Sequence, residues 1–313
     1  MTADAVRDVA TGFLADLDRN DMDAVGSWFA DGATWWVDTG RDRAAGVVGR
    51  DPGGERPWPL HGTMATAEKV PLLHGVPSRY PDGLRQRAWQ AFADDRTAVV
   101  EVDGDGTHVD GHRYANRYAF VIDVADGAIT AVREYLDTLH AADVFAGRGL
   151  DRRTEADVVV PPAPSATTDG GRAALDLVAA VSDGDLDAIA DVFTDDATWW
   201  TDGGTDRSAG ARTPATSPRH PFHGCIPIAD KLTAMAGIGA AFPDGLVIHP
   251  VRLVEDGDHV AVEVVGDAVH RNGRRYQNRY VFVLDVVDGR IAALREYADT
   301  LHIADVFGVD VPV

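Results

Sequence analysis

Hydrophobic residues near the start of the chain recur at the three- and four-residue steps of an amphipathic helix. These residues are Val6, Val9, Phe13, Leu14 and Leu17, and Leu175 and Val178 begin a similar pattern in the second half. Such spacing places an apolar stripe along one side of a helix. A second, shorter helix is predicted over residues 21–29 and again over 185–193, each with an aspartate near its start to cap it. The pattern therefore predicts a helical opening for each half of the chain.

Beyond these helices the pattern of apolar and polar residues changes to that of strands. The segment ATWWVD is strand-like, and a third helix is predicted around residues 66–73 and 229–235. The rest of each half alternates short apolar segments with turn residues such as ADG and VDG. Helices followed by a run of antiparallel strands are typical of an α+β fold, with the helices on one face of a curved sheet.

The two halves of the chain carry the same sequence plan. The segment REYLDTLHAADVF (133–145) differs from REYADTLHIADVF (295–307) only at Leu136/Ala298 and Ala141/Ile303. Residues 31–46 also match 195–210, and residues 114–127 match 276–289. A repeat of this length indicates domain duplication. Because residues 158–171 are rich in Pro and small residues, we predict a first domain over 1–150, a linker over 151–170 and a second domain over 171–313.

Charge and composition narrow the class of protein. Acidic residues number 50 against 29 basic ones, and the net charge of −21 repels nucleic acids and anionic lipids. The single cysteine, Cys225, rules out an internal disulfide, and no apolar run approaches the roughly 20 residues that span a bilayer. The amino-terminal segment lacks the apolar core of a signal peptide. We therefore expect a cytoplasmic protein that binds neither nucleic acid nor membranes.

The order of elements and motifs resembles a known family. Two helices, the ATWW-x-D motif, a third helix and strands that close on Y-x-N-R-Y and REY-x-DT are similar to the SnoaL-like branch of the NTF2-like superfamily. That superfamily also contains ketosteroid isomerases, limonene-epoxide hydrolase and polyketide cyclases. The resemblance covers nearly all of both copies, and the tandem arrangement is similar to that of polyether epoxide hydrolases.

The resemblance has consequences for architecture. It implies two cone-shaped α+β barrels, each a curved antiparallel sheet wrapped around helices. Single-domain relatives usually form dimers through the outer faces of their sheets. Fusion makes that association intramolecular, so we expect the two copies to pack as a pseudo-dimer. Whether the chain also forms a larger homo-oligomer stays open.

Two aspartates that follow tryptophan pairs are the first candidates for catalysis. Asp38 and Asp202 match, through the resemblance, the general-base aspartate of ketosteroid isomerases. Neighbouring indole rings would exclude water and raise the pKa of such a carboxyl, which makes it a better base near neutral pH. The alternative is a turn-forming aspartate before a glycine-containing segment.

Four further carboxylates are candidate catalytic residues: Asp137 and Asp299 near the end of each copy, and Glu101 and Glu263 within valine-rich strands. The resemblance implies that Asp137 matches a catalytic carboxylate of related epoxide hydrolases. The alternative is a structural acceptor that fixes the turn after the strand. Alternation along the strand does not decide whether Glu101 and Glu263 face solvent or a site.

Aromatic and amide side chains on the same strands are predicted to bind substrate. The resemblance implies that the strand face carrying Tyr135 and Asp137 is concave. By alternation the predicted substrate-binding residues are Trp36, Tyr114, Asn116, Tyr135, Trp200, Tyr276, Asn278 and Tyr297.

Glu68 and Asp230 on the third helix are candidates for a second acid. The neighbouring Lys69 and Lys231 indicate, as the alternative, an ordinary solvated helix face. One His and one Asp at i and i+3 after the last strand form a weak ligand set. We therefore expect no metal and no cofactor.

Several carboxylates around an aromatic pocket favour cofactor-independent acid–base chemistry. The predicted function is an isomerase or cyclase that acts on an apolar oxygenated small molecule, such as a polyketide, steroid-like or terpenoid intermediate. One alternative is an epoxide hydrolase or an enzyme that opens epoxides to form cyclic ethers. Another is a protein that binds small molecules without catalysis.

The assignment of Asp38 and Asp202 as bases has a direct test. Replacing both, Asp38→Asn with Asp202→Asn, should abolish turnover while the circular dichroism spectrum stays that of the folded protein, because asparagine keeps the shape but cannot accept the proton. Unchanged turnover in the double variant would end the assignment.

Overall fold

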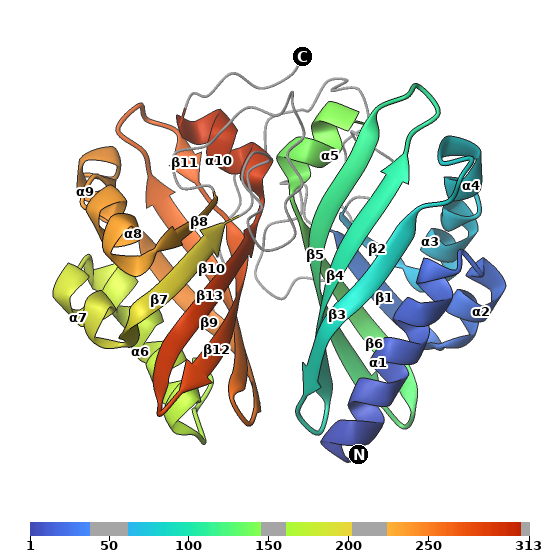
Figure 1. Cartoon of the computed structure of the whole chain (residues 1–313), viewed down its shortest axis with the longest axis horizontal. Helices are drawn as coiled ribbons and strands as arrows, with labels where there is room; N and C mark the ends of the chain where they lie inside the picture. Colours follow the sequence, from blue (N-terminus) through green and yellow to red (C-terminus); the bar gives the residue numbers. More distant parts are fainter. Residues whose placement is uncertain (38–61, 145–160, 202–223, 308–313) are drawn as a thin grey trace. The chain divides into compact units, whose positions relative to one another are not determined.

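The computed structural model describes residues 1–37, 62–144, 161–201 and 224–307, which belong to two compact units (Figure 1). The helices and strands of the first unit are α1 (Ala3–Asp18), α2 (Met22–Ser27), β1 (Phe29–Val37), β2 (Gly62–Ala65), α3 (Thr66–Leu73), α4 (Val76–Arg79), β3 (Arg85–Ala93), β4 (Thr97–Thr107), β5 (Arg113–Ala125), β6 (Ala128–Leu136) and α5 (Thr138–Val144).

The second unit repeats this order of elements. They are α6 (Asp169–Asp183), α7 (Leu186–Asp191), β7 (Phe193–Thr201), β8 (Gly224–Pro227), α8 (Ile228–Met235), α9 (Ile238–Ala241), β9 (Val247–Asp256), β10 (His259–Val269), β11 (Arg275–Tyr276), β12 (Arg279–Val287), β13 (Arg290–Ala298) and α10 (Thr300–Phe307). The predicted α+β class is confirmed.

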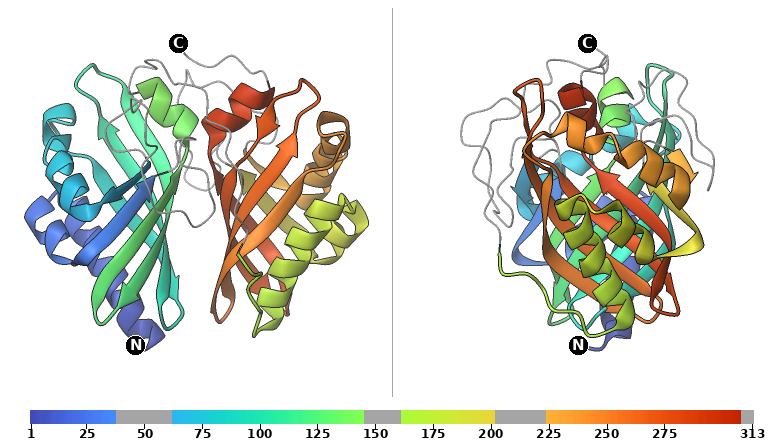
Figure 2. Two further views of the ribbon diagram at one scale, coloured as in Figure 1. Left: turned by 180° about the vertical axis from the view of Figure 1, so that it is seen from behind. Right: turned by 90° about the vertical axis from the view of Figure 1, so that its left-hand side faces the viewer.

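Among the described residues, each unit has one sheet that contains one parallel pair of strands. In the first unit the strand order is β2-β1-β6-β5-β4-β3, and β1 runs parallel to β6 while the other pairs are antiparallel. In the second unit β7 pairs in parallel with β13 in the same way. Helices α1 to α4 lie on one face of the curved sheet of the first unit and α6 to α9 on one face of the second, whereas α5 and α10 lie at one end of their sheets (Figure 2). Burial of that face creates the core.

Local sequence explains the opening helices. Thr2 caps α1 by accepting a hydrogen bond from the Ala5 N–H, and the predicted stripe from Val6 to Leu17 is largely buried. Phe13 of this stripe packs edge-to-face against Trp35 of β1, with ring centroids 5.4 Å apart. Thr168 caps the start of α6, and Gly184 caps its end. Gly184 has a φ of 69°, which lies in the left-handed region that glycine adopts easily.

The predicted domain limits lie mainly at residues outside the described ranges. Helix α6 begins at Asp169, so the last two residues of the predicted linker are helical. Thr167 and Thr168, just before this helix, both donate hydrogen bonds to the Glu255 carboxylate of β9. The boundary at residue 150 and the packing of the copies as a pseudo-dimer stay predictions. In the described ranges, no helix combines the length and apolar character needed to cross a membrane.

Gly12 in the middle of α1 provides a test of this packing. A Cβ atom there would lie 2.5 Å from Cη2 of Trp28, whose indole N–H donates to Asp16 at 2.7 Å. Alanine usually stabilises a helix relative to glycine by roughly 1 kcal/mol. We expect Gly12→Ala instead to lower the free energy of unfolding by about 1–3 kcal/mol in urea denaturation, because the indole must move.

The sequence of the second copy suggests a second substitution that should restore the stability lost in Gly12→Ala. It has Val192 where the first has Trp28, so Trp28→Val should remove the clash and make Gly12→Ala harmless or stabilising in that background. A Gly12→Ala variant as stable as the original protein would show that the indole does not constrain this position.

Candidate functional site

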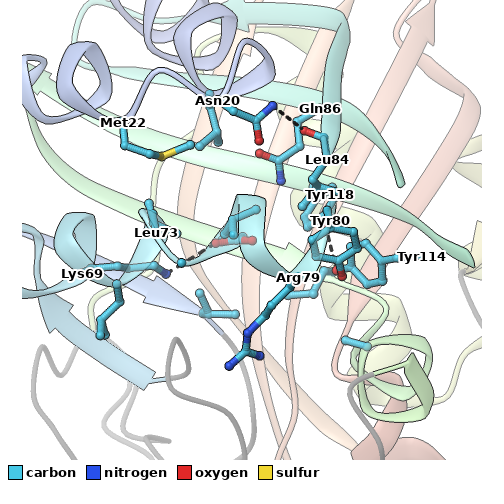
Figure 3. Close-up of a pocket in the computed structure, with 18 of the residues that line it drawn as sticks. Asn20, Met22, Lys69, Leu73, Arg79, Tyr80, Leu84, Gln86, Tyr114 and Tyr118 are labelled. Carbon is cyan, nitrogen blue, oxygen red and sulfur yellow. Dashed lines mark hydrogen bonds and ion pairs between the residues drawn. The ribbon is translucent and has the colours of Figure 1, made fainter. Parts of the chain in front are cut away.

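A cavity of about 320 Å³ opens between the helices and the inner face of the first sheet (Figure 3). Its wall combines apolar side chains such as Leu73 and Leu84 with a small set of polar ones. The polar residues that line it are Asn20, Lys69, Ser78, Arg79, Tyr80, Gln86, Tyr114, Tyr118 and Glu134. A concave, mainly apolar wall with a few placed polar groups is the usual form of a small-molecule site.

A buried ion pair forms part of this wall. Lys69 of α3 is 1% exposed, and its Nζ lies 3.6 Å from Oε2 of Glu134 on β6. The same nitrogen lies 4.3 Å from the ring centroid of Trp35 on β1, and the Trp35 indole N–H donates to Glu134 Oε2 at 2.8 Å. The cation–π contact and the hydrogen bond offset part of the cost of removing two charges from water. Three elements are thereby joined at one point.

The second unit repeats the ion pair with one addition. Lys231 Nζ lies 3.5 Å from Oε2 of Glu296, and the Trp199 indole N–H donates to the same oxygen at 2.8 Å. Thr201 donates to Glu296 at 2.7 Å and accepts from Lys231 at 2.9 Å, whereas its counterpart in the first unit is Val37. Burial lowers the pKa of Lys231, and the charge of Glu296 opposes this shift.

The sequence itself sets these two lysines apart. Lys69 and Lys231 are the only lysines in the whole chain, and they occupy equivalent positions of the repeat. Their place beside Glu68 and Asp230 predicts a solvated helix face. Glu68 and Asp230 are indeed exposed, but the next residue along each helix points about 100° further round and is buried.

Two tyrosines of β5 meet inside the first cavity. The Tyr118 hydroxyl donates to the Tyr114 hydroxyl at 2.7 Å, and Asn116 Nδ2 donates to the same Tyr114 oxygen at 3.1 Å. Burial raises the pKa of both tyrosines well above 10.0, and the charge of Glu134 adds to the shift. Both hydroxyls therefore stay protonated near neutral pH, and the proton of Tyr118 is donated to Tyr114. In the second unit Tyr276, Tyr280 and Asn278 repeat this arrangement.

Asp137 and Asp299 hold the ends of the last strands. Oδ1 of Asp137 accepts a hydrogen bond from the backbone N–H of His140 at 3.0 Å, as a cap at the start of α5. Asn116 binds the backbone N–H and C=O of Asp137. Asp299 makes the same contact with His302, and Asn278 with Asp299. Neither aspartate lines its cavity, so these contacts correspond to the turn-fixing alternative.

The structure reverses the face predicted for the last strand. Glu134 and Leu136 line the first cavity, whereas Tyr135 packs on the other face against Trp36, with ring centroids 5.2 Å apart. Tyr297 and Trp200 pack in the same way in the second unit, at 5.3 Å. Apolar or aromatic residues occupy both faces of these strands, so alternation alone could not identify the inner one.

Glu101 and Glu263 also lie on the face away from the cavities. On β4, Val100 and Val102 pair with Phe120 and Tyr118, so alternation places Glu101 on the opposite face from Tyr118. Glu263 forms an ion pair with Arg252 across β9 and β10, with Oε2 and Nε 3.0 Å apart.

Asp38 and Asp202, the first candidates for catalysis, lie outside the described residues. Val37, the residue directly before Asp38, lines the first cavity. Within the described ranges, no cluster of three or more His, Cys, Asp or Glu side chains could hold a metal ion. The prediction that no metal or cofactor takes part stays a prediction.

The ion pair of the second unit has a measurable energetic signature. Lys231→Met or Glu296→Gln alone leaves one buried group without its partner, and each should cost about 3–5 kcal/mol of unfolding free energy. The double variant should cost clearly less than the sum of the two. Urea unfolding followed by tryptophan fluorescence measures all three, with exposed Asp244→Asn as the control. Strictly additive effects would contradict a direct interaction.

Comparisons with known proteins found one family and several solved structures that are similar to parts of this chain. Residues 174–294 match the SnoaL-like domain family. The structure of TerC crystallised with polyporic acid is 18% identical, with 45% of this chain and 99% of that one covered and a TM-score of 0.37. IdmH, a putative polyketide cyclase from Streptomyces antibioticus, is 21% identical over 45% of this chain and 99% of its own, with a TM-score of 0.36.

An M. tuberculosis LEH-like epoxide hydrolase is 20% identical over 45% of this chain and 90% of its own, with a TM-score of 0.33. A comparison with curated protein sequences gave no match. The family match falls within the second unit, and the first unit repeats its element order, strand pairing and motifs. Residues 174–294 of the second unit are therefore similar to a SnoaL-like domain, and the first unit repeats the same order of elements and the same strand pairing.

Proposed function

We propose that this chain is a cofactor-independent acid–base enzyme of the isomerase or cyclase type, with a reaction site in the cavity of the first unit. Its substrate is an apolar oxygenated small molecule of the polyketide, steroid-like or terpenoid kind. The observation that carries the proposal is the buried Lys69–Glu134 pair in the wall of a cavity of about 320 Å³. A cavity of this size holds a small organic molecule.

Glu134 is the base in this proposal. Its carboxylate lies in the cavity wall, and the Trp35 N–H and the Lys69 ammonium hold it in place. A carboxylate fixed in a largely apolar site can remove a proton from carbon next to a carbonyl group. Asp38, which follows Val37 of the wall, is the second carboxylate that the proposal assigns to the reaction.

The tyrosine pair and Lys69 stabilise the product of that step. Removal of the proton leaves negative charge on the carbonyl oxygen, and prearranged donors lower the energy of such an oxyanion. Both tyrosines stay protonated because burial raises the pKa of each, and since Tyr118 donates its proton to Tyr114, the Tyr114 hydroxyl is the donor to the oxyanion in this proposal. The effect of the Glu134 charge on both tyrosines supports a common site for base and donors.

Proton exchange tests this assignment without knowledge of the natural substrate. A panel of cyclic ketones and 1,3-diketones is incubated with the protein in D₂O, and loss of the α-proton signals is followed by NMR. Glu134→Gln should slow the protein-catalysed exchange by about 10²–10⁴-fold, because the amide cannot accept the proton.

The control for this experiment is Asp95→Asn, a change to an exposed carboxylate in the turn between β3 and β4, which should leave exchange unchanged. Thermal unfolding of each variant checks that it is folded. Exchange by Glu134→Gln at the original rate, or no exchange by the intact protein with any compound of the panel, would contradict the proposed function. A parallel reaction with an epoxide in heavy-oxygen water separates hydrolysis from internal cyclisation.

A further inference from the structure

We infer that both units bind a small molecule and that the two ligands differ in charge: the first unit takes an apolar anion, and the second unit takes an uncharged apolar molecule. The inference deepens the proposed function, because it gives the charge of the substrate that the first cavity takes. It rests on that function for the reaction itself, while its test depends on binding alone.

The second unit also has room for a small organic molecule. A cavity of about 310 Å³ lies among α6, α7, α8, α9 and the segment before β9, and a smaller cavity of about 70 Å³ reaches the buried ion pair. The two cavities adjoin, because both are lined by Val181, Met235, Ile238, Phe242 and Leu246. The counterparts of these residues in the repeat line the cavity of the first unit: Leu17, Leu73, Val76, Tyr80 and Leu84. An apolar cavity of about 150 Å³ is known to hold benzene, so the same region of the fold can hold a ring in each copy.

The polar groups of the walls differ between the copies. Five polar residues of the first cavity have an apolar residue or a glycine as their counterpart: Asn20/Gly184, Ser78/Ala240, Arg79/Ala241, Tyr80/Phe242 and Gln86/Ile248. One change runs in the other direction, because Thr201 takes the place of Val37 and binds both members of the ion pair. The second unit therefore keeps the ion pair and the tyrosines but lacks most of the other polar groups.

The balance of charge in the walls differs as well. The described wall of the first cavity carries two cations, Lys69 and Arg79, and one carboxylate, Glu134. The described walls of the second unit carry one cation, Lys231, and two carboxylates, Glu296 and Asp183. An excess of positive charge attracts an anion, and an excess of negative charge repels it. The first cavity therefore favours an apolar anion, such as an enolate or a carboxylate, and the second unit disfavours one.

The contacts of the second unit do not favour a cation in place of the anion. Glu296 already accepts hydrogen bonds from the Trp199 indole and the Thr201 hydroxyl, and its carboxylate lies 3.5 Å from Lys231 Nζ. Asp183 is exposed at the end of α6, where water screens its charge. An uncharged apolar molecule therefore fits these walls best.

Arg79 is the residue of the first wall whose charge can be removed with the backbone left in place. Its carbonyl accepts a hydrogen bond from the Val109 N–H at 2.7 Å, and the Ala241 carbonyl accepts from the Arg271 N–H at the same distance. The second unit thus makes this contact with an alanine. Figure 3 shows Arg79 at the cavity below the tyrosines, and its side chain is exposed.

Two probes of matched shape test the inference. The anion is 2-naphthoate, and the uncharged probe is 2-acetonaphthone, which has a methyl group in place of the charged oxygen. Methionine methyl groups serve as reporters, because the chain has four methionines, of which Met22 lines the first cavity and Met235 both cavities of the second unit. Met22→Leu and Met235→Leu assign the two signals in protein labelled with ¹³C at the methionine methyl groups.

Each probe is titrated at neutral pH while both signals are followed. We expect naphthoate to shift the Met22 signal with a Kd about ten-fold or more below its Kd at Met235, because the excess charges of the two walls have opposite signs. Acetonaphthone should shift the Met235 signal with a Kd about ten-fold or more below that of naphthoate at the same methyl group. Added salt should weaken the binding of naphthoate at Met22 and leave that of acetonaphthone at Met235 unchanged.

Exchange of charges between the copies completes the experiment. Arg79→Ala should weaken naphthoate at Met22 by about five-fold or more, whereas Arg96→Ala, which removes an exposed arginine of the turn between β3 and β4, should have no effect. Ala241→Arg combined with Asp183→Asn gives the second walls two cations and one carboxylate, as in the first, and should strengthen naphthoate at Met235 several-fold. The methionine signals of each free variant report whether it is folded.

Equal affinity of naphthoate for the two units, or the failure of acetonaphthone to bind at Met235, would overturn the inference. Unchanged naphthoate binding by folded Arg79→Ala would do the same. The proposed function is judged separately, by proton exchange in Glu134→Gln. If the units do not differ in the charge of their ligands while Glu134→Gln still loses exchange, the inference fails and the proposed function stands. If they do differ but the intact protein exchanges no proton, the proposed function fails and the difference in ligand charge stands.

Discussion

A lysine–glutamate pair buried beneath an indole ring is the interaction on which each unit depends. In the first unit it connects α3, β1 and β6 through Lys69, Trp35 and Glu134. Removing two charges from water costs several kcal/mol per ion, so such a pair persists only where its geometry and additional contacts offset that cost. The indole supplies both a hydrogen bond to the carboxylate and a ring face to the ammonium. These contacts fix the position of α3 relative to the sheet.

The same pair has different surroundings in the two copies. In the first unit it borders a cavity with polar groups from several elements, and in the second Thr201 donates to the glutamate and accepts from the lysine. The two copies have therefore kept the ion pair while residues next to it differ, as Val37 and Thr201 do.

The general fold could be predicted from sequence, because the helical stripe of α1 and the repeated motifs are strong local signals. The face of β6 that points into the cavity could not be predicted, because Glu134 and Tyr135 lie on opposite faces and both faces carry apolar residues. Asp137 belongs to the repeated REY-x-DT motif, which made it a candidate for catalysis. Its contacts, however, are those of a helix cap. The clearest missed signal was the lysines: in a chain that otherwise uses arginine for its positive side chains, two lysines at equivalent positions indicate a need for a compact ammonium group.

Burial of these two lysines is the central claim, and limited acetylation tests it most directly. The native protein and the protein in urea are treated with acetic anhydride, and the modified sites are located by mass spectrometry of peptides. If both ammonium groups lie inside their units, the native protein should be acetylated at its terminal amine and at neither Lys69 nor Lys231, while all three sites react in urea. Equal reaction of either lysine in the native and unfolded protein would contradict the account.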